Sequence, residues 1–247
     1  MSKFFSGIFC AFLSFLISNS ICSGSELKFS RILEKYSASL KFYSEEISRS
    51  PNSILAYSRR GDARFFLGDI NGAKLDYEKM IELDPKLKIS HWRLGIVYFY
   101  LKDFSKAAMQ FEIYHNYDNV DRENGIWRFM SQFKQKGLDY AREGLLQYNS
   151  TDRPPYVWLY SMFRGELLPK DIFRKINQSD FSLDYKNRVL FHANLYVGIF
   201  LELTEGSKER AINYLEKAAG NKYGINSETY MWHVARIHYQ NLLNKNH

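Results

Sequence analysis

The feature that most constrains this chain is a period of 34 residues, present in two consecutive blocks, residues 54–87 and 88–121. Each block has a glycine at position 8, an alanine at position 20 and an aromatic residue at position 24. These residues are Gly61, Ala73 and Tyr77, then Gly95, Ala107 and Phe111. A glycine inside a helix costs about 1 kcal/mol relative to alanine. Its recurrence at position 8 therefore predicts two antiparallel helices per block that approach closely at that glycine.

This pattern resembles the tetratricopeptide repeat, which has a period of 34 residues and a helix–turn–helix unit. The resemblance implies an all-α fold over residues 25–247, an α-solenoid of antiparallel helix pairs with capping helices. Residues 54–87 and 88–121 are the clear repeats. We expect degenerate repeats at 26–53, 122–155 and 191–225, and a C-terminal capping helix at 227–244.

The degenerate repeats keep only part of the pattern. Ala141 stands at position 20 of residues 122–155, but Phe129 replaces the glycine at position 8. We therefore expect wider packing between helices at 122–135 and 138–148, with Trp127 and Phe133 in the extra space. In residues 191–225, Gly198 and Ala211 take the two small positions, with one extra residue in the turn between the helices.

The N-terminal segment has the pattern of a secretory signal peptide. Lys3 precedes an apolar run at residues 4–17, and small or polar residues follow it up to residue 24. Residues 1–24 are therefore predicted to be a signal peptide, and the protein to be exported, either periplasmic or secreted. The alternative is membrane association through residues 4–17, although this run is short for a membrane span. Both cysteines, Cys10 and Cys22, lie in this segment, so we expect the core to fold without an internal disulfide.

Charge and motifs give no sign of an enzyme or of a nucleic-acid binding protein. The 34 basic and 27 acidic residues are interspersed, without a basic run. The HExxH, GxxxxGK[ST], GxGxxG and GxSxG patterns are absent. We predict no cofactor, no metal and no catalysis. For the histidines we predict surface or capping roles; they are His91, His115, His192, His233, His238 and His247.

The resemblance also implies a concave groove lined by the first helices, at block positions 2, 5, 9, 12 and 13. The predicted partner-binding residues are Leu55, Ser58, Asp62, Phe65, Phe66, Ile89, Trp92, Ile96, Phe99 and Tyr100. Such an apolar groove suits an amphipathic helix or an extended peptide. The alternative is that the chain's own terminal helix fills the groove. The Lys and Asn pattern with which chaperone-tail clamps hold a terminal carboxylate is absent, so that function is not predicted. Arg59 and Arg93 share position 6 and either edge the groove or are solvated.

The functional prediction is an exported scaffold or adaptor that binds a protein or peptide partner and has no catalysis of its own. Residues 155–165, 193–202, 218–224 and 230–238 resemble segments of bacterial and algal tetratricopeptide proteins. A more distant resemblance is to periplasmic tetratricopeptide lipoprotein adaptors of enteric bacteria. Two alternatives stay open. One is a hydrolase or ligand-binding protein with a pocket between the repeat stack and residues 156–182, and the other is a membrane-anchored assembly factor.

Overall fold

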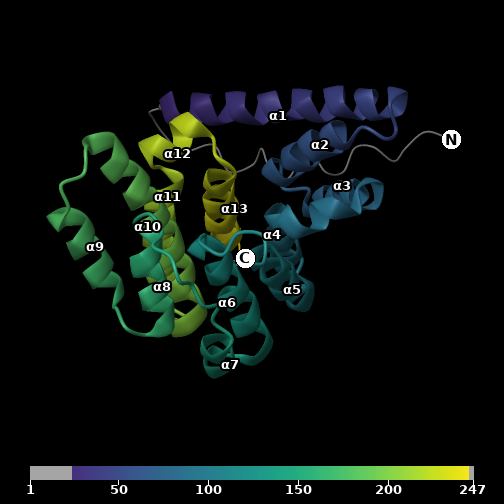
Figure 1. Cartoon of the computed structure of the whole chain (residues 1–247). Coiled ribbons are helices and arrows are strands. Elements are labelled where there is room, and N and C mark those ends of the chain that lie inside the picture. The colour runs from purple at the N-terminus through teal and green to yellow at the C-terminus, as the bar shows by residue number, and fades with distance from the viewer. Residues whose placement is uncertain (1–23, 245–247) are drawn as a thin grey trace. The chain divides into compact units, whose positions relative to one another are not determined.

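The computed structural model describes residues 24–244, and within them the chain is helical without any strand (Figure 1). This confirms the predicted all-α fold. The chain divides into two units, residues 1–35 and 36–247, and the packing below is that of the second unit. Within residues 24–244, no helix combines the length and the apolar character that crossing a membrane requires. Residues 1–23 lie outside the described residues. The signal-peptide and anchor predictions concern this segment and are not tested by the structure.

The two clear repeats form helix pairs with nearly the predicted bounds. α2 (Ile54–Phe66) pairs with α3 (Ile70–Leu83), and α4 (Trp92–Tyr100) pairs with α5 (Phe104–His115). The short 3-10 helix η1 (Pro85–Ser90) joins the two pairs. Ser53, Asp69 and Asp103 start α2, α3 and α5, because each side chain accepts a hydrogen bond from a backbone N–H three residues ahead. Upstream of them, where a degenerate repeat was expected at residues 26–53, the chain forms one long helix, α1 (Gly24–Arg49), and not a helix pair.

The glycine at position 8 lies beneath the aromatic ring at position 24. A Cβ atom added at Gly61 would lie 2.6 Å from the Tyr77 ring, and one added at Gly95 would lie 2.7 Å from the Phe111 ring. Both rings are fully buried. The predicted close approach is therefore confirmed, and the ring fills the space that the missing side chain leaves.

The third helix pair departs from the prediction in its second helix. α6 (Arg122–Lys136) has the expected start, but α7 (Leu138–Glu143) ends well before residue 148. Gly144 ends α7, where its carbonyl oxygen accepts a hydrogen bond from the Arg128 guanidinium. A Cβ atom at Gly144 would also lie 2.5 Å from the Gln132 side chain. The chain then leaves α7 as a loop.

The extra space at position 8 of this pair is filled by the next helix, α8 (Tyr156–Arg164). Phe163 of α8 meets Phe129 edge-on at 5.1 Å, and Phe133 stacks on Phe129 at 6.4 Å. Trp127 does not fill this space, because its ring stacks on Phe111 and its indole N–H donates to the Tyr196 hydroxyl. The prediction was therefore right for Phe133 and wrong for Trp127.

The rest of the unit contains α9 (Pro169–Gln178), α10 (Leu183–Glu205), α11 (Lys208–Ala219), α12 (Lys222–Ser227) and α13 (Tyr230–Asn244). α10 and α11 repeat the close packing, since a Cβ atom at Gly198 would lie 2.8 Å from Leu215. The single helix predicted at 227–244 is wrong at its start. Glu228 adopts a left-handed conformation with φ 46° after α12, and the Thr229 hydroxyl then accepts from the Trp232 N–H at the start of α13.

α13 does not cap the end of the stack. It packs against α11 and α2, and Figure 1 shows it between the α2–α7 helices and the α8–α12 helices. Five consecutive residues at its start are buried: Met231, Trp232, His233, Val234 and Ala235. A helix buried around more than one face belongs to an interior, so the capping role predicted for this helix is corrected to a central one.

Candidate functional site

Part of the predicted groove lies beneath α13. Phe65, Phe66, Ile96 and Phe99 are buried. The Phe65 ring stacks on Tyr230 at 4.7 Å, and the Phe66 ring stacks on the His233 imidazole at 3.8 Å. Of the two possibilities that the sequence leaves open, the structure therefore shows the chain's own terminal helix in this part of the groove.

The polar residues of the predicted groove have partners within the chain. Asp62 accepts from the Arg93 guanidinium and from the Tyr77 hydroxyl, each at 2.6 Å. Arg93 also donates to the Ser58 hydroxyl at 3.2 Å. Arg93 therefore edges the predicted groove through these bonds, whereas Arg59 is exposed.

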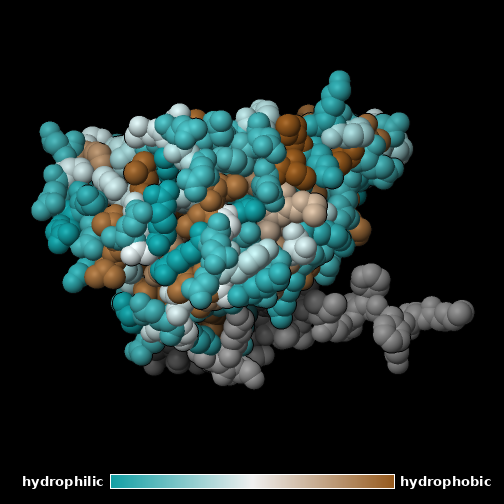
Figure 2. All heavy atoms as spheres, turned by 60° about the horizontal axis from the view of Figure 1, so that its bottom comes forward, coloured by the Kyte–Doolittle hydropathy of each residue, from teal (hydrophilic) through white to brown (hydrophobic). Residues whose placement is uncertain are grey.

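At the other end of α4, Tyr100 shares a hydrogen bond of 3.0 Å with His238 of α13, and His238 contacts Glu202 at 2.7 Å. Leu55 and Ile89 are the exposed members of the predicted set. Figure 2 shows a mainly hydrophilic face with hydrophobic residues in small separate groups.

For the histidines we predicted surface or capping roles, and four of the six do not lie at the surface. His91, His192, His233 and His238 are buried. His91 precedes α4, and neither of its ring nitrogens has a hydrogen-bond partner. Burial lowers the pKa of His91 to about 4. The other three contact tyrosine or glutamate side chains. Among residues 24–244, no group of three His, Cys, Asp or Glu side chains could hold a metal.

An open pocket of about 290 Å³ lies where the first helices of the repeat stack meet the helices of the C-terminal half. Trp92 of α4 and Trp127 of α6 contribute to one wall. The other wall contains charged and polar groups of α10 together with aromatic residues of α12 and α13. Of the predicted groove residues, Trp92 is the one in this pocket, half-buried and edge-on to Tyr230 at 5.1 Å.

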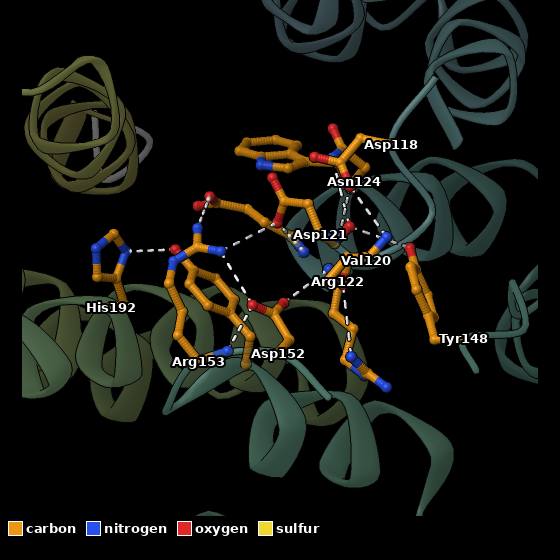
Figure 3. Close-up of polar contacts among 12 residues, drawn as sticks. Asp118, Val120, Asp121, Arg122, Asn124, Tyr148, Asp152, Arg153 and His192 are labelled. Atoms are coloured by element: carbon orange, nitrogen blue, oxygen red, sulfur yellow. Dashed lines mark hydrogen bonds and ion pairs between the residues drawn. The ribbon is translucent and has the colours of Figure 1, made fainter. Parts of the chain in front are cut away.

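The first turn of α6 brings two carboxyl groups to the pocket (Figure 3). Asp121 is the N-cap of α6, and its carboxylate accepts from the Glu123 N–H at 3.0 Å. The carboxylate of Asp118 in turn accepts from the Asp121 N–H at 3.1 Å. The Tyr148 hydroxyl donates to the Asp121 carbonyl oxygen at 3.2 Å. These bonds fix the start of α6, because helix N–H groups that lack an intrahelical partner are satisfied there.

Glu123 is a largely buried carboxyl at the base of this turn. It accepts a hydrogen bond from the Tyr196 hydroxyl, which itself accepts from the Trp127 indole N–H at 3.1 Å. Burial, followed by the charge of Asp121, raises the pKa of Glu123 to about 7. Burial also raises the pKa of Asp121, and the nearby Arg153 opposes that rise. Both carboxyls are therefore costly to ionise without additional positive charge.

Arg153 is the cation closest to these carboxyls, as Figure 3 shows. Its guanidinium contacts Asp152 at 3.0 Å but lies 3.9 Å from both Asp121 and Glu123. The Asp152 carboxylate also accepts from the Arg122 N–H at 3.0 Å, which ties the loop before α8 to the start of α6. The Arg153 guanidinium is thus shared by three carboxyl groups. Its shortest contact is with Asp152, which does not line the pocket.

α10 supplies the opposite side of the pocket. His192 shares a hydrogen bond of 2.7 Å with the Tyr156 hydroxyl, and burial lowers the pKa of His192 to about 3. His192 is therefore neutral near neutral pH and acts as a hydrogen-bonding group. Arg188 is exposed, and its guanidinium lies 5.8 Å from the Tyr223 ring centroid.

Sequence reasoning missed this pocket except for Trp92. The predicted pocket between the repeat stack and residues 156–182 is displaced, because the residues that face the stack come from the loop at Arg153 and from α10, α12 and α13. The sequence does contain charged residues near both ends of the degenerate repeat at 122–155, namely Asp121–Glu123 and Asp152 with Arg153. These residues could have pointed to the pocket. Sequence spacing alone did not show that these segments meet.

The comparisons with known proteins agree with the repeat pattern. The family model that matches is the tetratricopeptide repeat, over residues 54–87. Hsp70-Hsp90 organizing protein 3 of Arabidopsis thaliana is 34% identical over 104 residues, which is 41% of this chain and 19% of that protein. Hsp70-Hsp90 organizing protein of Triticum aestivum is 32% identical over 120 residues, 47% of this chain and 21% of that protein.

The chain thus spans about a fifth of the length of these curated relatives. A crystal structure of a tetratricopeptide repeat protein from Parabacteroides merdae ATCC 43184 is 15% identical, with a TM-score of 0.46 and coverage of 85% of this chain and 82% of that one. The described helices form an all-α solenoid of tetratricopeptide-type antiparallel pairs, and residues 54–87 are the repeat that carries the family's own sequence pattern.

Proposed function

We propose that this protein is an exported scaffold that binds a protein or peptide partner and performs no catalytic step itself. The fold class supports the scaffold role, since stacked helix pairs present extended binding surfaces. The observation that carries the proposal is the open pocket between the α4–α6 side of the repeat stack and α10–α13. It combines aromatic rings with charged groups, and such rings are the common anchors of protein interfaces.

This proposal places the partner at the pocket and not along the whole predicted groove. α13 already covers Phe65 and Phe66, and exposing them would remove ring contacts that stabilise the unit. Trp92 lies where the covered part of the groove ends and the pocket begins. A partner that reaches the pocket therefore contacts Trp92 without displacing α13.

The names of the relatives give weaker support. They are organizing proteins for Hsp70 and Hsp90, and this supports a protein partner for the present chain. The Lys and Asn residues of a chaperone-tail clamp are absent from this groove. Its polar residues Asp62 and Ser58 are instead hydrogen-bonded to Arg93. We therefore do not extend the proposal to a chaperone tail.

The ligand-binding part of the alternative prediction is compatible with the same pocket. A hydrolase that uses a carboxyl pair as acid and base would need the two groups to face each other across a substrate. Asp121 and Glu123 instead come from the same turn of α6, and Asp121 is used as the N-cap. The geometry thus favours binding over catalysis.

A library experiment tests the proposal directly. The full chain is immobilised and a display library of random dodecapeptides is selected against it, in parallel with the variants Trp92→Ala and Phe42→Ala. Phe42 is an exposed aromatic residue on α1, remote in sequence from the pocket residues. We expect an enriched sequence motif for wild type and for Phe42→Ala, and its loss for Trp92→Ala. An equal motif in all three proteins, or no enrichment by wild type, would contradict the proposal.

Export is tested separately. The basic residue and apolar run at residues 3–17 support a cleaved signal peptide. N-terminal sequencing of the mature protein should start close to residue 25. A mature protein that still carries residues 4–17 would favour the membrane-anchored alternative.

A further inference from the structure

The start of α6 places two carboxyl groups in the pocket, and they share their nearest cation, Arg153, with a third carboxyl group. Asp121 and Glu123 both line the pocket, and Arg153 lies 3.9 Å from each while contacting Asp152 at 3.0 Å. The strength of an ion pair falls with distance and with competition for the same cation. A second cation placed beside the two carboxyls would therefore be favoured over an anionic group when both carboxyls are ionised.

The walls of the pocket suit a cation as well. Three partly exposed aromatic residues line it, namely Trp92, Tyr223 and Tyr230. Aromatic faces attract ammonium and guanidinium groups through the ring quadrupole, and more strongly where water is partly excluded. Carboxylates at the base and rings on the walls together form a site for an organic cation with an apolar stem.

The size of the pocket limits what can enter. Its volume of about 290 Å³ lies just below the usual range of ligand sites, roughly 300–1,000 Å³. This fits one long side chain better than a larger ligand. We propose, on the basis of the scaffold function above, that this pocket binds the side chain of a lysine or arginine from the partner, with its charged head beside Asp121 and Glu123.

Arg188 gives this proposal a sharp test. It lines the pocket, is exposed and lies over the Tyr223 ring. If the pocket received a carboxylate, Arg188 would be its natural partner and its removal would weaken binding. If the pocket receives a cation, Arg188 repels it, and the neutral variant Arg188→Gln should bind a basic peptide as tightly as wild type or more tightly.

The groups around the carboxyls also predict a pH dependence. Glu123 and Asp121 come from α6, Arg153 from the loop before α8, and Arg188 and His192 from α10. Burial raises the pKa of Glu123 to about 7. The pKa of His192 is lowered to about 3 and that of Arg153 is raised, so neither of these two groups changes its charge between pH 6 and 8. Affinity for a basic peptide should therefore rise from pH 6 to pH 8.

The experiment uses the full chain and an array of peptides drawn from the enriched library sequences. Each peptide is N-acetylated and C-amidated and is printed in three versions, with lysine, with Nε-acetyl-lysine and with norleucine at each basic position. Butylammonium in solution is the competitor that represents a free small amine. The variants are Glu123→Gln and Arg188→Gln, with Glu209→Gln as a matched control at an exposed glutamate of α11.

We expect acetylation of one lysine to weaken binding by wild type and by Glu209→Gln at least tenfold, and to weaken binding by Glu123→Gln less than about threefold. Butylammonium should compete only at concentrations far above those of the peptide, and equal potency would overturn the partner side chain as the source. Binding that is insensitive to acetylation, or that Arg188→Gln abolishes, would overturn the cation pocket and leave the scaffold function standing. Failure of wild type to bind any peptide would overturn the scaffold function itself.

Discussion

The regular helix pairs α2/α3 and α4/α5 differ from the pair α6/α7 at block position 8. In the regular pairs, Gly61 and Gly95 lie under the rings of Tyr77 and Phe111, and both helices run their full length. In the third pair Phe129 occupies the same position, α7 ends early, and α8 supplies the missing contact.

This difference has a consequence for the candidate site. Because the chain leaves α7 early, the loop from residue 145 to residue 155 returns to the start of α6 and brings Asp152 and Arg153 beside Asp121 and Glu123. The regular pairs give a filled surface that α13 covers, whereas the irregular pair borders an open, charged pocket. The departure from the repeat pattern thus lies next to the site.

The largest expected effect comes from removing the ring that replaces the glycine. Phe129→Ala should lower the free energy of unfolding by about 3–5 kcal/mol, because a fully buried ring packed on Phe163 leaves a cavity. Urea denaturation followed by circular dichroism measures this. A loss below about 1 kcal/mol would mean that Phe129 does not replace the usual contact.

The opposite substitution tests the regular pair. Gly95→Val should cost about 2 kcal/mol, because the new side chain would overlap the Phe111 ring. The double variant with Phe111→Ala should be more stable than the sum of the two single losses predicts, since the valine then enters the space of the ring. Strict additivity in the same urea experiment would argue against direct contact between the two positions.

A third prediction concerns the charged pocket beside the irregular pair α6/α7. The folded state raises the pKa of Glu123 from about 4.5 to about 7, so its ionisation opposes folding above pH 7 and has no such cost below pH 4.5. Glu123→Gln should therefore stabilise the protein by about 3 kcal/mol at pH 8, and this gain should vanish by pH 4.5. A gain that does not depend on pH would contradict the buried carboxyl as its cause.

The smallest effect is expected in the regular helix pairs, at the residue before α4. His91 is buried with both ring nitrogens unpartnered, so His91→Phe should stabilise the protein by about 1 kcal/mol at pH 7. Its pKa falls from 6.5 to about 4 on folding, so the unfolded state takes up the proton first and wild type loses stability as the pH falls from 6.5 to 4. The advantage of His91→Phe should therefore grow over that range in thermal melts, and a constant difference would contradict it.

The sequence by itself determined the parts of this protein that depend on local spacing. A period of 34 residues with glycine under an aromatic ring dictates paired helices, because the contact lies between neighbouring segments of the chain. Helix bounds at Ser53, Asp69 and Asp103 follow from capping for the same reason.

Tertiary structure alone decided which surface stays open. α13 reaches Phe66 from far along the chain, and Glu123 meets Arg153 and Tyr196 only once the third pair has opened and α10 has packed against it. Such contacts depend on how several helices share space, and a single period in the sequence does not encode that arrangement. The pocket and its charge balance are therefore properties of the folded chain.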